Sequence, residues 1–356
     1  MLQIQKNISL KAYNTFAVDV SADFFVEIHY EQDVFDLMSN DVFATSRHLI
    51  LGWGANILFT KNYDWLLIKI SLLGKELINE DNNNVYIKVW WGENWHDTMM
   101  RSLSQWYVWG ENLVLIPGQV GSAPVGNIGA YGKEAKDIIY AVEWIDLTTK
   151  EKKVWTNSEC QFAYRDSIFK HELKDTILIT SVIFVFEKQS ADYIPNIEYK
   201  DIQERIVAEW KNPSEISAQE IADIIISIRE SKLPDWTTIG TAGSFFKNPI
   251  IVQEQYEQLL LKYPQIKGNK IQEVDNVEHH DTHNLPSVKL SAGQLIELAG
   301  YKGKSVGNVA TYEKHALVIV NNGGASGIEI RAFAQSIQER VLELFWVKLE
   351  AEVIIL

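Results

Sequence analysis

A glycine-bearing turn in the first half of the chain has the residue types that bind an anionic group. The turn, Leu51–Phe59, reads LGWGANILF and separates two apolar runs. Glycines let backbone N–H groups approach an anion closely, because no Cβ stands in the way. The candidate binding residues here are Gly52, Gly54, Ala55 and Asn56. A second turn, Gly92–His96, leads into a helical pattern whose N-terminal amides could meet a phosphate.

The longest glycine segment spans residues 116–132 and reads IPGQVGSAPVGNIGAYG. A segment with so few large side chains can wrap a cofactor through backbone amides and small hydroxyls. Each turn alone is weak evidence, because most glycine turns only reverse the chain. None has Rossmann spacing between a strand and a helix, so an ordinary nicotinamide-binding domain is not indicated. The candidate cofactor-binding residues of this segment are Pro117, Gly118, Gly121, Ser122, Asn127, Gly129, Ala130 and Tyr131.

Short apolar runs alternate with helical patterns along the chain, which indicates a mixed α/β or α+β protein. One helix is predicted from Ser217 to Pro234, because Ser217 and Glu220 form a capping-box pattern before a stripe of isoleucines. Another is predicted over Ile328–Phe345. The expected strands are His48–Leu51, Val85–Trp90, Ala141–Leu147, Ile177–Phe186, Ala316–Val320 and Lys348–Leu356.

Composition restricts the class of protein further. The 356 residues carry a net charge of −14, which disfavours binding to nucleic acid, since that requires an excess of Lys and Arg. Cys160 is the single cysteine, so neither an intrachain disulfide nor a thiolate cluster is expected. The sequence begins without an apolar signal core, and it has no apolar stretch of the roughly 20 residues that span a bilayer. We therefore expect a cytoplasmic monomer that does not bind membranes.

The order and spacing of several motifs resemble one family. Leu51–Phe59 is similar to LGGGSNILF, Gly110–Tyr131 to LENLxLIPGxVGxxPxQNIGAYG, and Phe162–Lys170 to FGYRDSIFK. Ala242–Pro249 and Leu349–Val353 extend the match into the second half. The chain thus resembles the UDP-N-acetylenolpyruvoylglucosamine reductase (MurB) family over nearly its whole length. YRDSIFK and the segment around Tyr199 resemble the longer form of the family.

The resemblance implies an α+β fold: a vanillyl-alcohol-oxidase (PCMH) type FAD-binding domain of two subdomains, followed by a C-terminal α+β substrate-binding domain. We expect the first domain over residues 1–190, with subdomains of about 1–70 and 71–190. Residues 191–214 would form a linker with a tyrosine loop, and residues 215–356 the C-terminal domain. The implied activity is the NADPH-dependent reduction of UDP-N-acetylglucosamine enolpyruvate to UDP-N-acetylmuramate, an early step in peptidoglycan synthesis, with FAD as cofactor.

The resemblance also assigns roles to residues. Hydride addition to an unsaturated carboxylate moves charge onto the α-carbon and the carboxylate, so the site needs fixed cations and a proton donor. By resemblance, Arg165 stabilises the enolate, Ser244 protonates it and Glu352 assists. Glu350 and Glu352 are two residues apart in an expected strand and would share a face. The implied substrate-binding residues are Tyr199, Arg229, Lys232, Asn248 and His315.

Structural alternatives stay open for most of these residues. Arg165 could be a surface arginine paired with a carboxylate, and Ser244 could be a turn hydroxyl. Arg229 and Lys232 could simply favour a helix C-terminus. Tyr199 and Tyr131 could be packing aromatics. His96 is interpreted as a satisfied helix residue. The segment Glu278–His283, with three histidines, is interpreted as a solvated loop, so no metal site is expected.

Tryptophans replace small residues of the family pattern at four places. They are Trp53, Trp90, Trp91 and Trp109. Where such a backbone must approach a pyrophosphate, an indole would crowd it, and a positive φ would cost about 1 kcal/mol or more. The alternative function is therefore a catalytically weakened relative that binds nucleotide sugar but holds FAD poorly. An oxidase with covalently attached FAD is disfavoured, because no histidine lies near residues 118–132.

Overall fold

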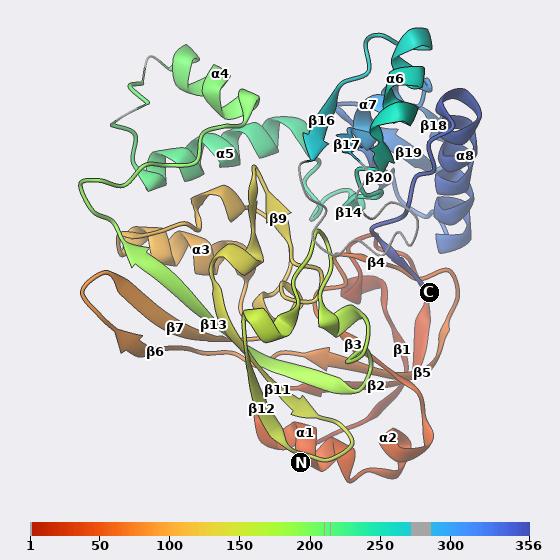
Figure 1. Cartoon of the computed structure of the whole chain (residues 1–356). Coiled ribbons are helices and arrows are strands. Elements are labelled where there is room, and N and C mark those ends of the chain that lie inside the picture. The colour runs from red at the N-terminus through yellow and green to blue at the C-terminus, as the bar shows by residue number, and fades with distance from the viewer. Residues whose placement is uncertain (1, 210, 214, 272–285) are drawn as a thin grey trace. The chain divides into compact units, whose positions relative to one another are not determined.

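The computed structural model describes residues 2–209, 211–213, 215–271 and 286–356 (Figure 1). The chain forms two compact units. Unit 1 comprises Met1–Ile8, Ala22–Trp53 and Asp64–Ser231. Unit 2 comprises Ser9–Ser21, Gly54–Tyr63 and Lys232–Leu356. The domain boundaries expected near residues 190 and 214 stay a prediction.

Unit 1 is built on two main sheets. The first has the order β1-β2-β5-β3, and the second has the order β12-β11-β13-β7-β6, with β8 paired to β13. Figure 1 shows β13 as the long strand at the centre of the second sheet. The strands are β1 (Gln5–Ser9), β2 (Ser21–Ile28), β3 (His48–Leu51), β5 (Tyr63–Ile70), β6 (Lys75–Glu80), β7 (Asn84–Trp90), β8 (Tyr107–Val108), β9 (Gly129–Ala130), β10 (Lys133–Glu134), β11 (Ile139–Asp146), β12 (Lys152–Thr156) and β13 (Ile177–Lys188).

The described residues of this part of the chain form five α-helices. They are α1 (Glu31–Met38), α2 (Asp41–Thr45), α3 (Trp95–Ser104), α4 (Lys200–Ala208) and α5 (Ala218–Lys232). The largest buried side chain of α3, Trp95, packs edge-on against Phe184 of β13 at 5.8 Å between ring centroids. Its indole Nε1 donates to the Leu113 carbonyl at 2.7 Å, so this buried polar group is satisfied. Trp95 therefore connects α3 to β13 and to Leu113, which lies just before the glycine segment 116–132.

Unit 2 has a four-stranded sheet of order β14-β20-β19-β18 and a three-stranded sheet of order β15-β17-β16. The helices α7 and α8 pack on the first of these sheets (Figure 1). The strands are β4 (Ile57–Leu58), β14 (Gly240–Ser244), β15 (Ile250–Val252), β16 (Gly268–Ile271), β17 (Ser287–Leu290), β18 (Ser305–Val306), β19 (Val309–Tyr312), β20 (His315–Asn321) and β21 (Ile354–Ile355). The helices are α6 (Gln253–Lys262), α7 (Ala292–Leu298) and α8 (Gly327–Phe345).

The structure confirms most of the predicted elements. β3 has the predicted bounds, and β7, β11, β13 and β20 lie within two residues of theirs. The strand predicted over Lys348–Leu356 is wrong, because only Ile354–Ile355 forms a strand there, in parallel with β4. Glu350 and Glu352 therefore do not share a strand face. The segment Glu278–His283 lies outside the described residues.

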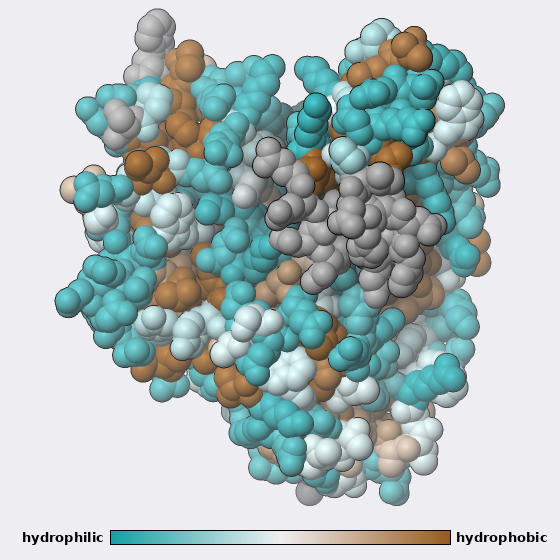
Figure 2. Space-filling view, viewed as in Figure 1, coloured by the Kyte–Doolittle hydropathy of each residue, from teal (hydrophilic) through white to brown (hydrophobic). Residues whose placement is uncertain are grey.

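The surface of the described chain carries scattered apolar side chains. Tyr30, Ile194 and Leu261 are among the large exposed ones. On the face shown in Figure 2, hydrophobic residues form small patches among hydrophilic ones. Among the described residues, no helix combines the length and the apolar character needed to cross a bilayer.

The N-terminus of α5 is the predicted capping box. Glu220 accepts hydrogen bonds from the backbone N–H and the hydroxyl of Ser217 at 3.0 and 2.9 Å, and the Ser217 hydroxyl accepts the Glu220 N–H. These bonds, together with Lys211, lower the pKa of Glu220 to about 2. Ile221, Ile224 and Ile225 are buried, as the isoleucine stripe predicts.

The lowered pKa of Glu220 predicts a pH-dependent contribution to stability. The folded-state pKa lies below the unfolded value, so the stabilisation is present above pH 4.5 and is lost as the pH falls through about 2. We expect Glu220→Gln to lower the melting temperature at pH 6, and the gap from the parent to close between pH 4.5 and 2. The measurement is a set of thermal melts across this range. A gap that does not change with pH would contradict the assignment.

Candidate cofactor and active site

The three glycine-bearing segments of the first half converge on the side chain of Gln119 in unit 1. Gln119 is buried, and its Nε2 donates to the Gly92 carbonyl at 2.9 Å. Its Oε1 lies 3.0 Å from where a Cβ on Gly52 would stand. One residue of the longest segment thus contacts both other turns. The sequence predicted the turns separately but gave no sign that Gln119 joins them.

The Trp91 indole requires glycine at position 121. A Cβ on Gly121 would lie 2.2 Å from Cδ2 of the indole, closer than real contacts allow. The Gly121 N–H donates to the Trp91 carbonyl at 3.0 Å, which holds the two backbones together. The glycine segment therefore packs directly against Trp91, the residue that follows β7.

Two buried polar atoms face Gly52 with no hydrogen-bond partner in the described part of the chain. They are the donor Trp91 Nε1 and the acceptor Gln119 Oε1. They lie 3.5 and 3.0 Å from the position that a Cβ on Gly52 would occupy. An unsatisfied buried polar group costs about 1–3 kcal/mol, so such a pair is unfavourable without a ligand. A donor and an acceptor beside a glycine backbone fit a polar group of a bound cofactor, and the residues present here fit FAD in this respect.

The unusual tryptophans differ in their backbone conformation. Trp53 is outside the left-handed region, which is taken instead by Gly54 with φ of +65°. A Cβ on Gly54 would lie 2.2 Å from the Tyr13 carbonyl oxygen, so glycine is required there. Trp109 does take the left-handed conformation, with φ of +82°. The expected backbone cost therefore falls on Trp109 and not on Trp53.

The Gly92–His96 turn is used within the protein. The Trp95 N–H donates to the Gly118 carbonyl at 3.1 Å, and the Asp97 N–H donates to the Asn94 side chain at 3.1 Å. Since these N-terminal donors of α3 are occupied, the turn positions the glycine segment and is not suited to a phosphate.

His96 Nδ1 accepts the Leu115 N–H at 3.0 Å, and burial lowers the pKa of His96. His96 is thus a neutral, satisfied helix residue, as expected.

Arg165 lies against the second half of the longest glycine segment. Its Nη1 donates to the Asn127 carbonyl at 3.3 Å, and its Nη2 donates to the Gly129 carbonyl at 2.6 Å. Arg165 has a left-handed backbone with φ of +57° inside the turn closed by the bridge between Ala163 and Asp166. The neighbouring Asp166 carboxylate is bonded by His171 Nε2 at 2.7 Å. The structure therefore brings a predicted catalytic residue to predicted cofactor-binding residues.

Asn127 organises this segment through its side chain. Nδ2 donates to Glu134 and to the Ala163 carbonyl, both at 2.9 Å, while Oδ1 accepts the Lys136 N–H at 3.0 Å. Ser122 Oγ donates to the Gln119 carbonyl at 2.7 Å. The Asn127 amide donors are thus already used. Its backbone N–H donates to the Pro124 carbonyl and its carbonyl accepts from Arg165, so its predicted contact with a cofactor stays a prediction.

Tyr131, Tyr199 and Arg229 are also brought together in unit 1. The rings of Tyr131 and Tyr199 meet edge-on at 5.4 Å, and Tyr131 lies close enough to Arg229 to interact with it electrostatically. Arg229 Nη2 donates to the Leu115 carbonyl at 3.2 Å, while Nε is buried without a partner in the described residues. Burial lowers the pKa of Arg229. A guanidinium with a buried, unused N–H suits an anionic ligand better than a purely structural role.

In unit 2 the backbone places Glu352 beside the segment of Ser244. The Glu352 N–H donates to the Phe245 carbonyl at 2.9 Å, and Phe246 forms an isolated bridge with Ala351. Ser244 is exposed and Glu352 is partly buried. Asn56, a predicted cofactor residue, donates through Nδ2 to the Glu352 carbonyl at 3.1 Å.

The start of α7 gathers two predicted substrate residues. Asn248 Oδ1 accepts the Ala292 N–H at 3.0 Å. His315 Cε1 lies 4.0 Å from where a Cβ on Gly293 would stand. Lys232 is the last residue of α5. The roles predicted for these residues stay predictions.

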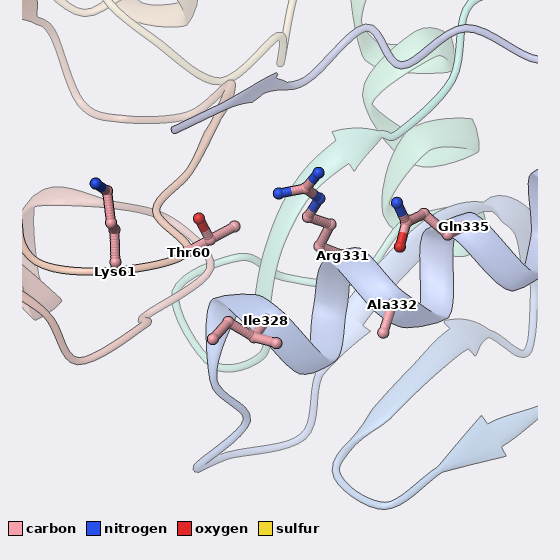
Figure 3. A pocket seen from close by; sticks show the side chains of 6 residues that line it. All are labelled: Thr60, Lys61, Ile328, Arg331, Ala332 and Gln335. Carbon is pink, nitrogen blue, oxygen red and sulfur yellow. The ribbon is translucent and has the colours of Figure 1, made fainter.

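A separate hollow of about 400 Å³ lies beside α8 (Figure 3). It is lined by none of the predicted site residues, so it takes no part in the site. Its lining residues are Thr60, Lys61, Ile328, Arg331, Ala332 and Gln335.

Comparisons with known proteins show the family of the chain. The family model of an FAD binding domain matches residues 22–154, and the model of the C-terminal domain of UDP-N-acetylenolpyruvoylglucosamine reductase matches residues 234–356. The UDP-N-acetylenolpyruvoylglucosamine reductase of Flavobacterium johnsoniae is 41% identical over 99% of both chains. That of Bdellovibrio bacteriovorus is 40% identical over 99% of both chains.

A solved structure shows the same fold. It is the UDP-N-acetylenolpyruvylglucosamine reductase of Thermus caldophilus, which matches with a TM-score of 0.67 at 20% identity and covers 100% of this chain and 99% of its own. The fold and the glycine segments thus define an α+β flavoprotein oxidoreductase with an FAD-binding domain and a second, C-terminal domain. The chain belongs to the UDP-N-acetylenolpyruvoylglucosamine reductase family. The expected fold class and the FAD cofactor are confirmed.

The unpaired Trp91 Nε1 predicts a contribution to FAD affinity. Trp91→Phe keeps a ring against Gly121 but removes the donor, so we expect FAD to bind about five- to tenfold more weakly, as for one lost hydrogen bond. The measurement is quenching of FAD fluorescence during titration with apoprotein. Trp90→Phe is the control, because the Trp90 ring packs against Gly74 and Lys88. Equal binding would contradict a hydrogen bond from Trp91 to FAD, and tighter binding would support crowding of the cofactor by the indole.

Proposed function

We propose that this protein reduces UDP-N-acetylglucosamine enolpyruvate to UDP-N-acetylmuramate, with NADPH as the reductant and FAD as the cofactor. The observation that supports the proposal most directly is the hydrogen bond from the Glu352 N–H to the Phe245 carbonyl, which joins the backbone of Glu352 to the residue that follows the exposed Ser244. The names of the curated relatives supply the substrate. In this proposal the protein acts as a cytoplasmic monomer in the synthesis of peptidoglycan precursors.

The residues proposed to hold FAD lie in the two longer glycine segments. Backbone amides of Gly52, Gly118 and Gln119, together with Trp91 Nε1, would bind its polar groups. When bound, FAD would accept two electrons from NADPH and pass them to the enolpyruvyl double bond of the substrate. Arg165, which is bonded to the Asn127 and Gly129 carbonyls, would stand at the edge of this segment.

Hydride addition to the β-carbon of the enolpyruvyl group would place negative charge on the α-carbon and its carboxylate until a proton is added. The planar Arg165 guanidinium is suited to hold that carboxylate through two parallel hydrogen bonds. The Ser244 hydroxyl would deliver a proton to the α-carbon, and the Glu352 carboxylate would orient the reacting groups. Arg229, Lys232 and Tyr199 would bind the pyrophosphate of the substrate, with Asn248 and His315 contacting its remaining polar groups.

Ser244→Ala should separate the two half-reactions. Bleaching of the flavin by NADPH should stay within about tenfold of the parent, whereas reoxidation by the enolpyruvyl substrate should slow by at least ~10²-fold, as for a lost acid catalyst. Both rates can be measured by stopped-flow absorbance. Ser336→Ala is the matched control, because the Ser336 hydroxyl donates within α8 to the Phe333 carbonyl. Equal slowing of both half-reactions would indicate a structural turn residue.

Arg165→Ala should keep FAD but lose productive reduction of the substrate, because the guanidinium is assigned to the substrate carboxylate. Arg165→Lys should recover less than about a tenth of the reoxidation rate, since an ammonium cannot make two parallel bonds. Flavin absorbance per protein and the reoxidation rate are the readouts. Loss of FAD in either variant would show that Arg165 serves the glycine segment through the Asn127 and Gly129 carbonyls.

Flavin content also separates the active enzyme from a weakened relative. A purified protein with a flavin absorbance band supports the proposal. A colourless protein that still binds the UDP-sugar would favour the weakened relative.

A further inference from the structure

Glu111 is a fully buried carboxylate in unit 1. Oε1 accepts the Tyr193 hydroxyl at 2.6 Å, and Oε2 accepts the Trp109 N–H at 2.7 Å. Burial raises the pKa of Glu111 and also that of Tyr193, so the tyrosine remains a neutral donor. Since a buried carboxylate is costly without donors, the Tyr193 hydroxyl is strongly bound in this position.

Asn112, the next residue, makes a second connection to the same segment. It is fully buried, and Nδ2 donates to the Tyr131 and Asn196 carbonyls, both at 3.1 Å. Glu111 therefore binds Tyr193, and Asn112 joins Asn196 to Tyr131 at the end of the glycine segment. The segment 193–199 has no strand or helix of its own to hold it.

Aromatic contacts continue the same connection. Trp109 meets Tyr193 edge-on at 5.5 Å between ring centroids, and Lys133 Nζ lies 4.7 Å from the centre of the Trp109 ring. The left-handed backbone of Trp109 directs both its N–H and its ring toward these partners. At the far end of the segment, Tyr199 meets Tyr131.

We propose that Glu111 and Asn112 are positioning residues, which hold the segment 193–199 on the glycine segment and so keep Tyr199 over Tyr131, near Arg229. The assignment rests on the proposed function, in which Tyr199 and Arg229 bind the substrate pyrophosphate. Neither Glu111 nor Asn112 contacts the substrate. They act through the segment, and the substrate class affected is the nucleotide diphosphate sugar.

The first test measures the segment without any turnover. Tyr193→Phe removes the hydroxyl that Glu111 binds and keeps the ring. In the FAD-loaded full chain, we expect amide hydrogen exchange within residues 193–199 to be at least fivefold faster than in the parent. Tyr140→Phe is the matched control, because the Tyr140 side chain is exposed on β11. Unchanged exchange in Tyr193→Phe would overturn the proposal. Glu111→Ala should also speed exchange in residues 193–199, and Glu111→Gln, which keeps an acceptor oxygen, should show part of the protection that Glu111→Ala loses.

The second test measures whether the segment acts through Tyr199. We expect Tyr193→Phe to raise KM for the UDP-sugar about tenfold, with flavin bleaching by NADPH unchanged. The double variant Tyr193→Phe/Tyr199→Phe should have the same KM as Tyr199→Phe alone, because the two residues act in one pathway. Effects that multiply would overturn the positioning role. A parent that is bleached by NADPH but not reoxidised by the UDP-sugar would contradict the proposed function alone, since the exchange measurement still decides on the role of Glu111.

Discussion

The contact between the Trp91 indole and the backbone of Gly121 is the constraint on which the candidate cofactor site depends. The indole lies so close to the Gly121 Cα that no side chain fits, and the two backbones are joined by a hydrogen bond. The same approach brings Gln119 to Gly92 and turns its Oε1 toward Gly52. The positions of the candidate FAD contacts thus follow from packing at the end of one strand.

Unit 2 positions its candidate residues by a different means. Ser244 lies at the end of β14, and the Glu352 N–H donates to the carbonyl of the next residue, Phe245. Main-chain pairing does not depend on which side chains are present, so it can bring these two segments together whatever residues they carry. Unit 1 instead uses buried side chains, such as Asn127 and Asn112, to fix a segment that has little regular structure.

Local pattern was sufficient to predict the elements whose own residues determine them. The capping box and isoleucine stripe predicted α5, and β3 has the predicted bounds. Lys348–Leu356 was mispredicted because apolar alternation says nothing about whether a partner strand is present, and only Ile354–Ile355 has one. The role of Gln119 could not be predicted, since it depends on contacts among segments far apart in sequence. Glu111 did offer a signal, because a charged residue stands at the start of an otherwise apolar run.

The Trp91–Gly121 contact also restricts the order in which this sequence can change. A β-carbon at position 121 is incompatible with the indole, whereas a smaller residue at position 91 leaves glycine at 121 acceptable. A lineage can therefore gain a side chain at 121 only after position 91 has become smaller. In the opposite direction, a tryptophan at 91 can arise only where 121 is already glycine, so the two positions are historically coupled although thirty residues separate them.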